Sequence, residues 1–176
     1  MKYFIISDVH GSKHYLELAI KRFKESKADV LVCLGDFYYH GPRNPLTLEY
    51  DPMSVASVFN DLGDKLIAIK GNCDAEVDQM ISTFTFRKNY TIDLGGNKFY
   101  FHHGHNEVEN PSQYKVIFYG HFHVGEIKRV DDVIYANPGS ISLPKAKDSQ
   151  GYMILTKKGI EHYDLITNNL INDYVF

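Results

Sequence analysis

The sequence has few cysteines and no long apolar run, and these absences exclude several classes of protein. Two cysteines occur in 176 residues, Cys33 in an apolar stretch and Cys73 in a polar turn, so a disulfide framework is excluded. No stretch approaches the about 18 apolar residues of a membrane-spanning helix. Because Asp8 and His10 interrupt the apolar start, we expect no signal peptide, and a cytoplasmic protein is the default expectation.

An excess of positive charge is also absent. The chain has 19 basic and 22 acidic residues, a net charge of −3, so it lacks the basic footprint of a nucleic-acid-binding protein. A hydrophobic content of 44% with 23% charged residues is ordinary for a globular protein. The length suits a two-layer core, and we expect residues 1–176 to form a single domain.

Strands and helices alternate in the first half of the sequence. Short apolar stretches predict buried strands over residues 2–7, 28–36 and 65–72. Apolar residues at helical spacing predict helices over residues 13–25 and 52–62. This β-α-β-α-β order predicts a parallel sheet with helices packed against it.

In the second half, strands replace helices. A short helix is expected from Asp74, and a Gly-Gly hairpin over residues 89–105 follows it. Further strands are expected within residues 114–124, 126–140 and 151–166. This part of the chain therefore predicts a second, more antiparallel sheet stacked on the first.

Polar side chains that can bind metal ions lie just past the carboxyl ends of five predicted strands. Active sites of open α/β sheets form at this edge. These seven residues offer only oxygen and imidazole donors, more than one tetrahedral zinc site needs. They suit two divalent ions that share a carboxylate, and Asp36 is the candidate for the shared ligand. Mixed oxygen and nitrogen ligands favour Mn²⁺, Fe²⁺ or Zn²⁺. The candidate ligands are Asp8, His10, Asp36, Asn72, His103, His121 and His123.

These residues belong to motifs that occur in a fixed order: Asp8-x-His10, Gly35-Asp36, Gly71-Asn72, His103-Gly104-His105 and Gly120-His121-x-His123. With Asn-Pro-Gly-Ser at 137–140, the set resembles the calcineurin-like metallophosphoesterases. The strings HGPRN (40–44) and GNCDAEVDQM (71–80) resemble a small bacterial phosphodiesterase of that family. The resemblance implies an α/β fold, a two-sheet β-sandwich flanked by helices (αββα).

The resemblance also implies the roles of the ligands. Asp8, His10 and His123 would hold one metal ion, and Asn72, His103 and His121 the other, with Asp36 as the bridge. His105 is implied only as a neighbour of the site.

The activity implied is that of a metal-dependent phosphodiesterase acting on a small phosphoester. A metal-bridging hydroxide would attack phosphorus in line, without a covalent enzyme intermediate. Two divalent ions are expected, with Mn²⁺ favoured over Zn²⁺, Fe²⁺ or Ni²⁺. The alternatives are a phosphomonoesterase of the same family and a non-catalytic scaffold with this fold, as in the retromer subunit. An exposed edge strand would support a homo-oligomer.

Cys73 is where the sequence departs from the family pattern. Many members have Gly-Asn-His where this chain has Gly71-Asn72-Cys73, and that histidine is usually assigned to protonate the leaving oxygen or stabilise the transition state. A thiol lacks the charge of an imidazolium. Cys73 is either a passive wall of the pocket, a weak acid or substrate contact, or a metal ligand or redox-sensitive site. The substitution favours phosphodiesters, or esters with good leaving groups.

The loop over residues 37–45 supplies two further candidates. Arg43 could bind a phosphate oxygen bidentately, and His40 could line the pocket or donate a proton. The alternative is that Pro42 and Pro45 stiffen a loop whose polar groups face water.

Overall fold

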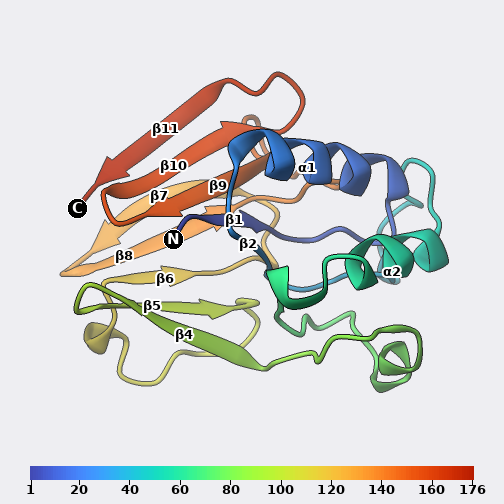
Figure 1. Ribbon diagram of the computed structural model, residues 1–176, viewed down its shortest axis with the longest axis horizontal. Coiled ribbons are helices and arrows are strands. Elements are labelled where there is room, and N and C mark those ends of the chain that lie inside the picture. The colour runs from blue at the N-terminus through green and yellow to red at the C-terminus, as the bar shows by residue number, and fades with distance from the viewer.

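The computed structural model describes residues 1–176 as two stacked sheets with two α-helices (Figure 1). The six-stranded sheet has the order β11-β10-β9-β1-β2-β3, and the five-stranded sheet has the order β4-β5-β6-β8-β7. The elements are β1 (Tyr3–Ile6), α1 (Lys13–Ser26), β2 (Val30–Cys33), α2 (Pro52–Asn60), η1 (Gly63–Lys65), β3 (Leu66–Ala68), η2 (Glu76–Ile81), β4 (Asn89–Leu94), β5 (Asn97–His102), η3 (Pro111–Gln113), β6 (Val116–Phe118), β7 (Gly125–Val130), β8 (Val133–Pro138), β9 (Gly151–Thr156), β10 (Gly159–Asp164) and β11 (Leu170–Val175).

The first half folds as the sequence predicts. Strands β1, β2 and β3 pair in parallel, and α1 and α2 connect them. The Ser12 side chain accepts a hydrogen bond from the Tyr15 main-chain N–H at the start of α1. Asp51 does the same for the Ser54 N–H at the start of α2, with Pro52 in the first turn. None of the helices has the length and apolar composition needed to cross a membrane.

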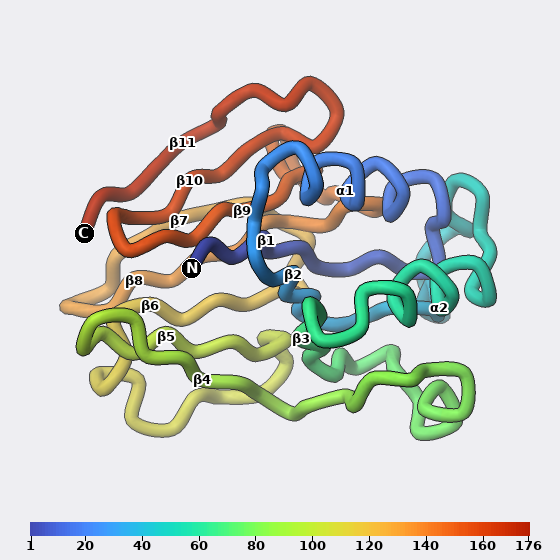
Figure 2. The backbone as a smooth tube through the Cα atoms, in the orientation of Figure 1, coloured from blue at the N-terminus to red at the C-terminus, as the bar shows by residue number.

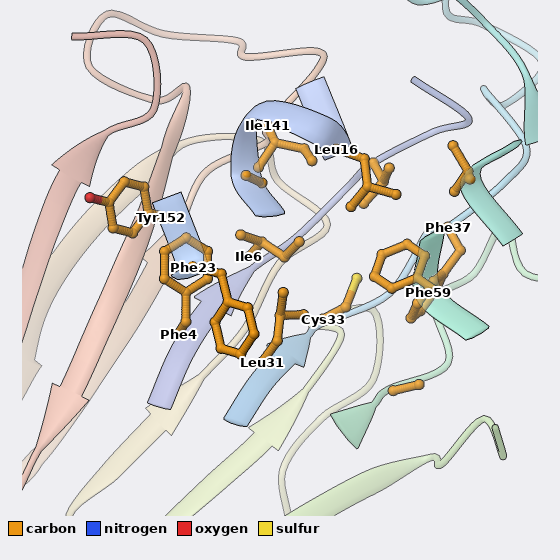
Figure 3. Packing of buried hydrophobic residues seen from close by; sticks show 14 of the residues in the cluster. Phe4, Ile6, Leu16, Phe23, Leu31, Cys33, Phe37, Phe59, Ile141 and Tyr152 are labelled. Carbon is orange, nitrogen blue, oxygen red and sulfur yellow. The ribbon is translucent and has the colours of Figure 1, made fainter. Parts of the chain in front are cut away.

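Two apolar cores hold the layers together. One lies between the six-stranded sheet and the helices, where Phe4 of β1 stacks on Tyr152 of β9 at 4.5 Å and Cys33 is fully buried (Figure 3). The other lies between the sheets and is built from inward-facing residues such as Ile5, Phe101 and Phe118. The fold class, a two-sheet α/β sandwich, is confirmed, with both α-helices on the six-stranded sheet.

The second half departs from its prediction in sheet membership. The hairpin of β4 and β5 is confirmed, but β9, β10 and β11 add to the first sheet through the antiparallel pair β1–β9 (Figure 2). The five-stranded sheet is mixed rather than mainly antiparallel, since β5–β6 and β6–β8 are parallel pairs. The prediction also omits β11. A local pattern identifies a strand but carries no information about its partner, which packing decides.

Candidate metal centre

The predicted ligands meet at one edge of the sandwich, where β1, β2, β3, β5 and β6 end. The loops after β1 and β2 continue the parallel pairing, because Asp8 N–H donates to the Gly35 carbonyl and His10 N–H to the Asp36 carbonyl. The loop after β6 is tied to β5 in the same way, through Gly120 N–H and the His103 carbonyl. Main-chain hydrogen bonds thus place these segments side by side.

One group of predicted ligands is formed by Asp8, His10 and His123, all buried. The Oδ1 atom of Asp8 lies 3.2 Å from His123 Nε2 and 3.7 Å from His10 Nε2, and the two Nε2 atoms are 3.2 Å apart. The spacing of these three donor atoms fits a shared cation.

A second group surrounds Asp36, whose Oδ2 lies 3.4 Å from His103 Nε2 and 3.7 Å from His10 Nε2. Asn72 Oδ1 is 3.0 Å from His103 Nε2 and 2.7 Å from His121 Nδ1. Asp36 therefore stands between the two groups, and the structure brings together all seven residues that the sequence suggests.

Main-chain carbonyls orient three of the histidines. The Nδ1 atoms of His10, His103 and His123 lie 2.8, 2.8 and 2.7 Å from the carbonyl oxygens of Tyr39, Leu34 and Leu143. A carbonyl can only accept, so each Nδ1 donates its proton outward and each Nε2 faces the centre. This arrangement is the usual support for metal-binding histidines.

The charges of the centre fit a cation. Burial alone would raise the pKa of Asp8, but His10 and His123 outweigh it and hold that pKa well below its usual value. Burial would also raise the pKa of Asp36, but His103 outweighs burial and lowers that pKa. Asp8 Oδ1 is buried and has no hydrogen-bond partner. Two buried, ionised carboxylates need positive charge beside them, which the histidines supply in the metal-free chain and a bound cation can supply instead.

The backbone at the centre is unusually strained. Positive φ angles, which L-residues other than glycine rarely adopt, occur at ligands in the loops after β1, β2 and β6. Such conformations cost about 1–3 kcal/mol each and cluster at functional sites. The affected predicted ligands are Asp8 (57°), His10 (49°), Asp36 (58°), His121 (68°) and His123 (59°).

Asp74 is a supporting residue that sequence reasoning missed. Its buried carboxylate accepts main-chain hydrogen bonds from Asp36, Phe37 and Gly71 at 2.9, 2.7 and 2.7 Å. It thereby joins the two turns that carry Asp36 and Asn72. The short helix expected from Asp74 is present as the 3-10 helix η2, which begins at Glu76. The only sequence signal was an aspartate in a turn already rich in polar residues.

The loop after β8 supports Asp8. The hydroxyl groups of Ser140 and Ser142 donate to the Asp8 carbonyl at 2.7 and 3.0 Å. Of these two residues, Ser140 closes the Asn-Pro-Gly-Ser string that supported the resemblance.

Cys73 lies against the centre. Its main-chain N–H donates to Asp36 Oδ1 at 2.8 Å, and its Sγ is within 4.8 Å of ligand atoms of His10 and Asp36. Burial and the neighbouring Asp36 raise the pKa of the half-buried thiol to about 12, so it is protonated at neutral pH in the metal-free chain.

The other two candidates are farther from the ligands. The His40 ring packs edge-on against Tyr39 and Tyr50, with centroids 4.8 and 5.3 Å away, and contacts none of the predicted ligands. Arg43 is exposed and forms no ion pair. Their loop nevertheless reaches the site, because a Cβ at Gly41 would lie 3.6 Å from Cys73 Sγ. The roles of His40 and Arg43 stay predictions.

Known proteins share this architecture, and some have related sequences. Residues 1–159 match the model of the calcineurin-like phosphoesterase superfamily domain. The phosphodiesterase YfcE of Escherichia coli is 37% identical over 160 residues, which cover 88% of this chain and 87% of YfcE. A solved structure of YfcE, described as a phosphoesterase, has a TM-score of 0.92 at 33% identity and covers 99% of both chains.

Fold similarity extends to proteins of low identity. Vps29 from Entamoeba histolytica, solved with Zn²⁺, has a TM-score of 0.65 at 16% identity over 99% of both chains, which shows a shared fold.

The chain belongs to the calcineurin-like phosphoesterase superfamily, whose members are metal-dependent hydrolases of phosphoesters. The small bacterial phosphodiesterase that residues 40–44 and 71–80 resemble is YfcE, so this part of the prediction is confirmed.

Proposed function

We propose that the chain is a phosphodiesterase that hydrolyses its substrate by in-line attack of a hydroxide held between two divalent metal ions. The observation that carries this proposal is the position of Asp36. A single oxygen, Oδ2, faces His10 on one side and His103 on the other, at 3.7 and 3.4 Å. A carboxylate oxygen between two sets of ligands is the arrangement that a two-metal site requires.

Bound at this centre, two divalent ions would supply hydroxide at neutral pH and neutralise the charge of the phosphoryl group. Asp8, His10 and His123 would hold one ion, and Asn72, His103 and His121 the other, with Asp36 shared. The two carboxylates contribute −2 against +4 from the ions. The site would therefore attract an anionic phosphoester although the chain carries a net charge of −3. We propose Mn²⁺ as the native metal, one of the three ions, with Fe²⁺ and Zn²⁺, that oxygen and imidazole donors suit.

Cys73 favours a diester over a monoester as substrate. A monoester carries one more negative charge than a diester, so its cleavage gains more from a cationic acid beside the leaving oxygen. Cys73 occupies the position of that acid in many family members, and a neutral thiol supplies no such charge. The name of YfcE, a phosphodiesterase with 37% identity, supports the same preference.

The test is a metal and substrate screen of the purified protein. Bis-p-nitrophenyl phosphate and p-nitrophenyl phosphate are offered with Mn²⁺, Ni²⁺, Zn²⁺ or Mg²⁺, and bound metal is measured by mass spectrometry. We expect diester hydrolysis with Mn²⁺ to exceed monoester hydrolysis, and two ions per chain. The absence of both bound metal and hydrolysis would instead indicate a scaffold.

Two substitutions test the shared carboxylate and its neighbour. Asp36→Ala and His103→Ala should each lower kcat by more than about a hundredfold and reduce the bound metal, because each removes a direct ligand. His14→Ala is the matched control, since His14 is a partly exposed histidine of α1, outside the centre. Full turnover in both ligand variants would refute the two-metal assignment.

A further inference from the structure

A second feature adjoins the predicted metal centre on the side of His103. A pocket of about 360 Å³ opens between the start of β4, the end of β5 and the segment over residues 103–114. His103 and His105 both line it, so the pocket is continuous with the centre. Its volume is in the range of small-ligand sites, about 300–1,000 Å³.

Four carboxamide side chains line this pocket, those of Asn89, Asn106, Asn110 and Gln113, and we call it the amide pocket. Among its lining residues only His103 uses its side chain in hydrogen bonds within the protein. The four carboxamides are therefore free to pair with a ligand. Side chains of this kind form paired hydrogen bonds with the edges of nucleobases.

An aromatic pair forms part of the wall. The rings of Tyr100 and Tyr114 stack on each other with centroids 4.7 Å apart and an interplanar angle of 27°. Both residues are only partly buried, so the pair also presents aromatic surface to the pocket. Stacking on tyrosine is a common way to hold a nucleobase.

The charged and apolar residues of the amide pocket further restrict the class of ligand that it could bind. Apart from its three histidines, the lining carries one cation, Lys88, and two anions, Glu107 and Glu109. Only Tyr100 and Tyr114 give it apolar surface, which does not suit an acyl chain. A neutral, ring-shaped group with many hydrogen-bonding atoms matches the lining.

We propose that the amide pocket binds the nucleoside portion of a nucleotide phosphodiester whose phosphorus lies at the predicted metal centre. The proposal rests on the proposed function for the identity of the reacting bond. It adds that Asn106 and Gln113 determine specificity by hydrogen bonding to the nucleoside, while Tyr100 and Tyr114 stack on it.

Two diesters with the same leaving group test this assignment. Thymidine 5′-(p-nitrophenyl phosphate) offers a nucleoside to the amide pocket, whereas bis-p-nitrophenyl phosphate does not. In the double variant Asn106→Leu/Gln113→Leu, KM for the thymidine ester should rise about tenfold, the effect of two neutral hydrogen bonds of ordinary strength. With bis-p-nitrophenyl phosphate, kcat/KM should change less than about twofold.

The matched control is Asn97→Leu. Asn97 is an exposed carboxamide at the start of β5, outside the amide pocket, and its substitution should leave both substrates unaffected. Equal effects of the double variant on the two substrates, or no effect on either, would overturn the assignment.

A binding measurement separates this inference from the proposed function. Calorimetric titration of the Mn²⁺-loaded protein compares thymidine 5′-monophosphate with inorganic phosphate. We expect the nucleotide to bind at least about tenfold more tightly, and the double variant to lose that advantage. If no diester is hydrolysed, the proposed function fails while this preference still supports the pocket. Equal affinity for nucleotide and phosphate would refute the pocket even if hydrolysis is observed.

Discussion

Gly71 lies where an added methyl group has no room, and Gly71→Ala should therefore displace Asp36. A Cβ built at Gly71 overlaps the main-chain N and the Oδ1 of Asp36 and lies 2.9 Å from its Cγ, whereas ordinary contact begins at 3.4 Å. Rotation of the Asp36 side chain does not relieve the overlap with the main chain. The backbone must move by about 1 Å, and a displacement of this size in an active site costs about a hundredfold in rate.

The assay combines turnover, metal content and stability. Gly71→Ala should lower kcat on bis-p-nitrophenyl phosphate about a hundredfold and reduce the bound Mn²⁺. It should lower the free energy of unfolding by about 1–3 kcal/mol, as overpacking does. The control is Gly95→Ala in the β4–β5 hairpin, where φ is 69° and no atom lies within 4 Å of the new Cβ. That variant should lose about 1–2 kcal/mol to backbone strain and keep full activity.

Comparing Gly71→Ala with Gly95→Ala separates an effect on the metal centre from a general loss of stability. If Gly71→Ala kept normal turnover and metal content per folded molecule, Asp36 would not depend on the close approach of the two turns. The reasoning about the shared carboxylate would then be refuted.

Three further predictions concern metal, thiol and pH. Removal of metal with a chelator should lower Tm, and Mn²⁺ should restore it, because an ion that binds at buried Asp8 and Asp36 binds only the folded chain and so stabilises it; an unchanged Tm would contradict this. Cys73→Ser should keep kcat within about tenfold if the thiol is a passive wall, and a loss above about a hundredfold, about 2.7 kcal/mol, would reject that role. Burial lowers the pKa of His162 from its ordinary value of 6.5. Below pH 6.5 the unfolded chain therefore binds a proton more readily than the folded chain, so the free energy of unfolding is highest above pH 6.5 and falls below it. His162→Gln should flatten that part of the unfolding profile measured by urea titration, and an unchanged profile would show that other groups cause it.

The candidate site was accessible from sequence because each ligand follows directly from a local rule. Asp8 and His10 stand two residues apart after an apolar strand, and parallel strands in one sheet place such ends together. The role of Asp74 was not accessible in this way. Its carboxylate reaches the main chain of Asp36, 38 residues earlier in sequence, and only the path of the folded backbone creates that contact.

Sheet membership shows the same limit. The sequence over residues 151–166 indicates strands with a turn between them, and β9 and β10 form that hairpin. It does not show that β9 pairs with β1, near the other end of the chain. That choice depends on which apolar faces fill the two cores, and no short stretch of sequence contains this information.

The distance along the chain between the ligand segments has a kinetic consequence. The hydrogen bond from His121 N–H to Asp8 Oδ2 spans 113 residues, and the bond from His103 to the Leu34 carbonyl spans 69. Contacts of such long range close large loops, and we predict that they form late in folding. Interactions that form late slow unfolding more than they accelerate folding. Metal bound at this edge would therefore slow unfolding and lengthen the lifetime of the folded protein, while leaving its folding rate nearly unchanged.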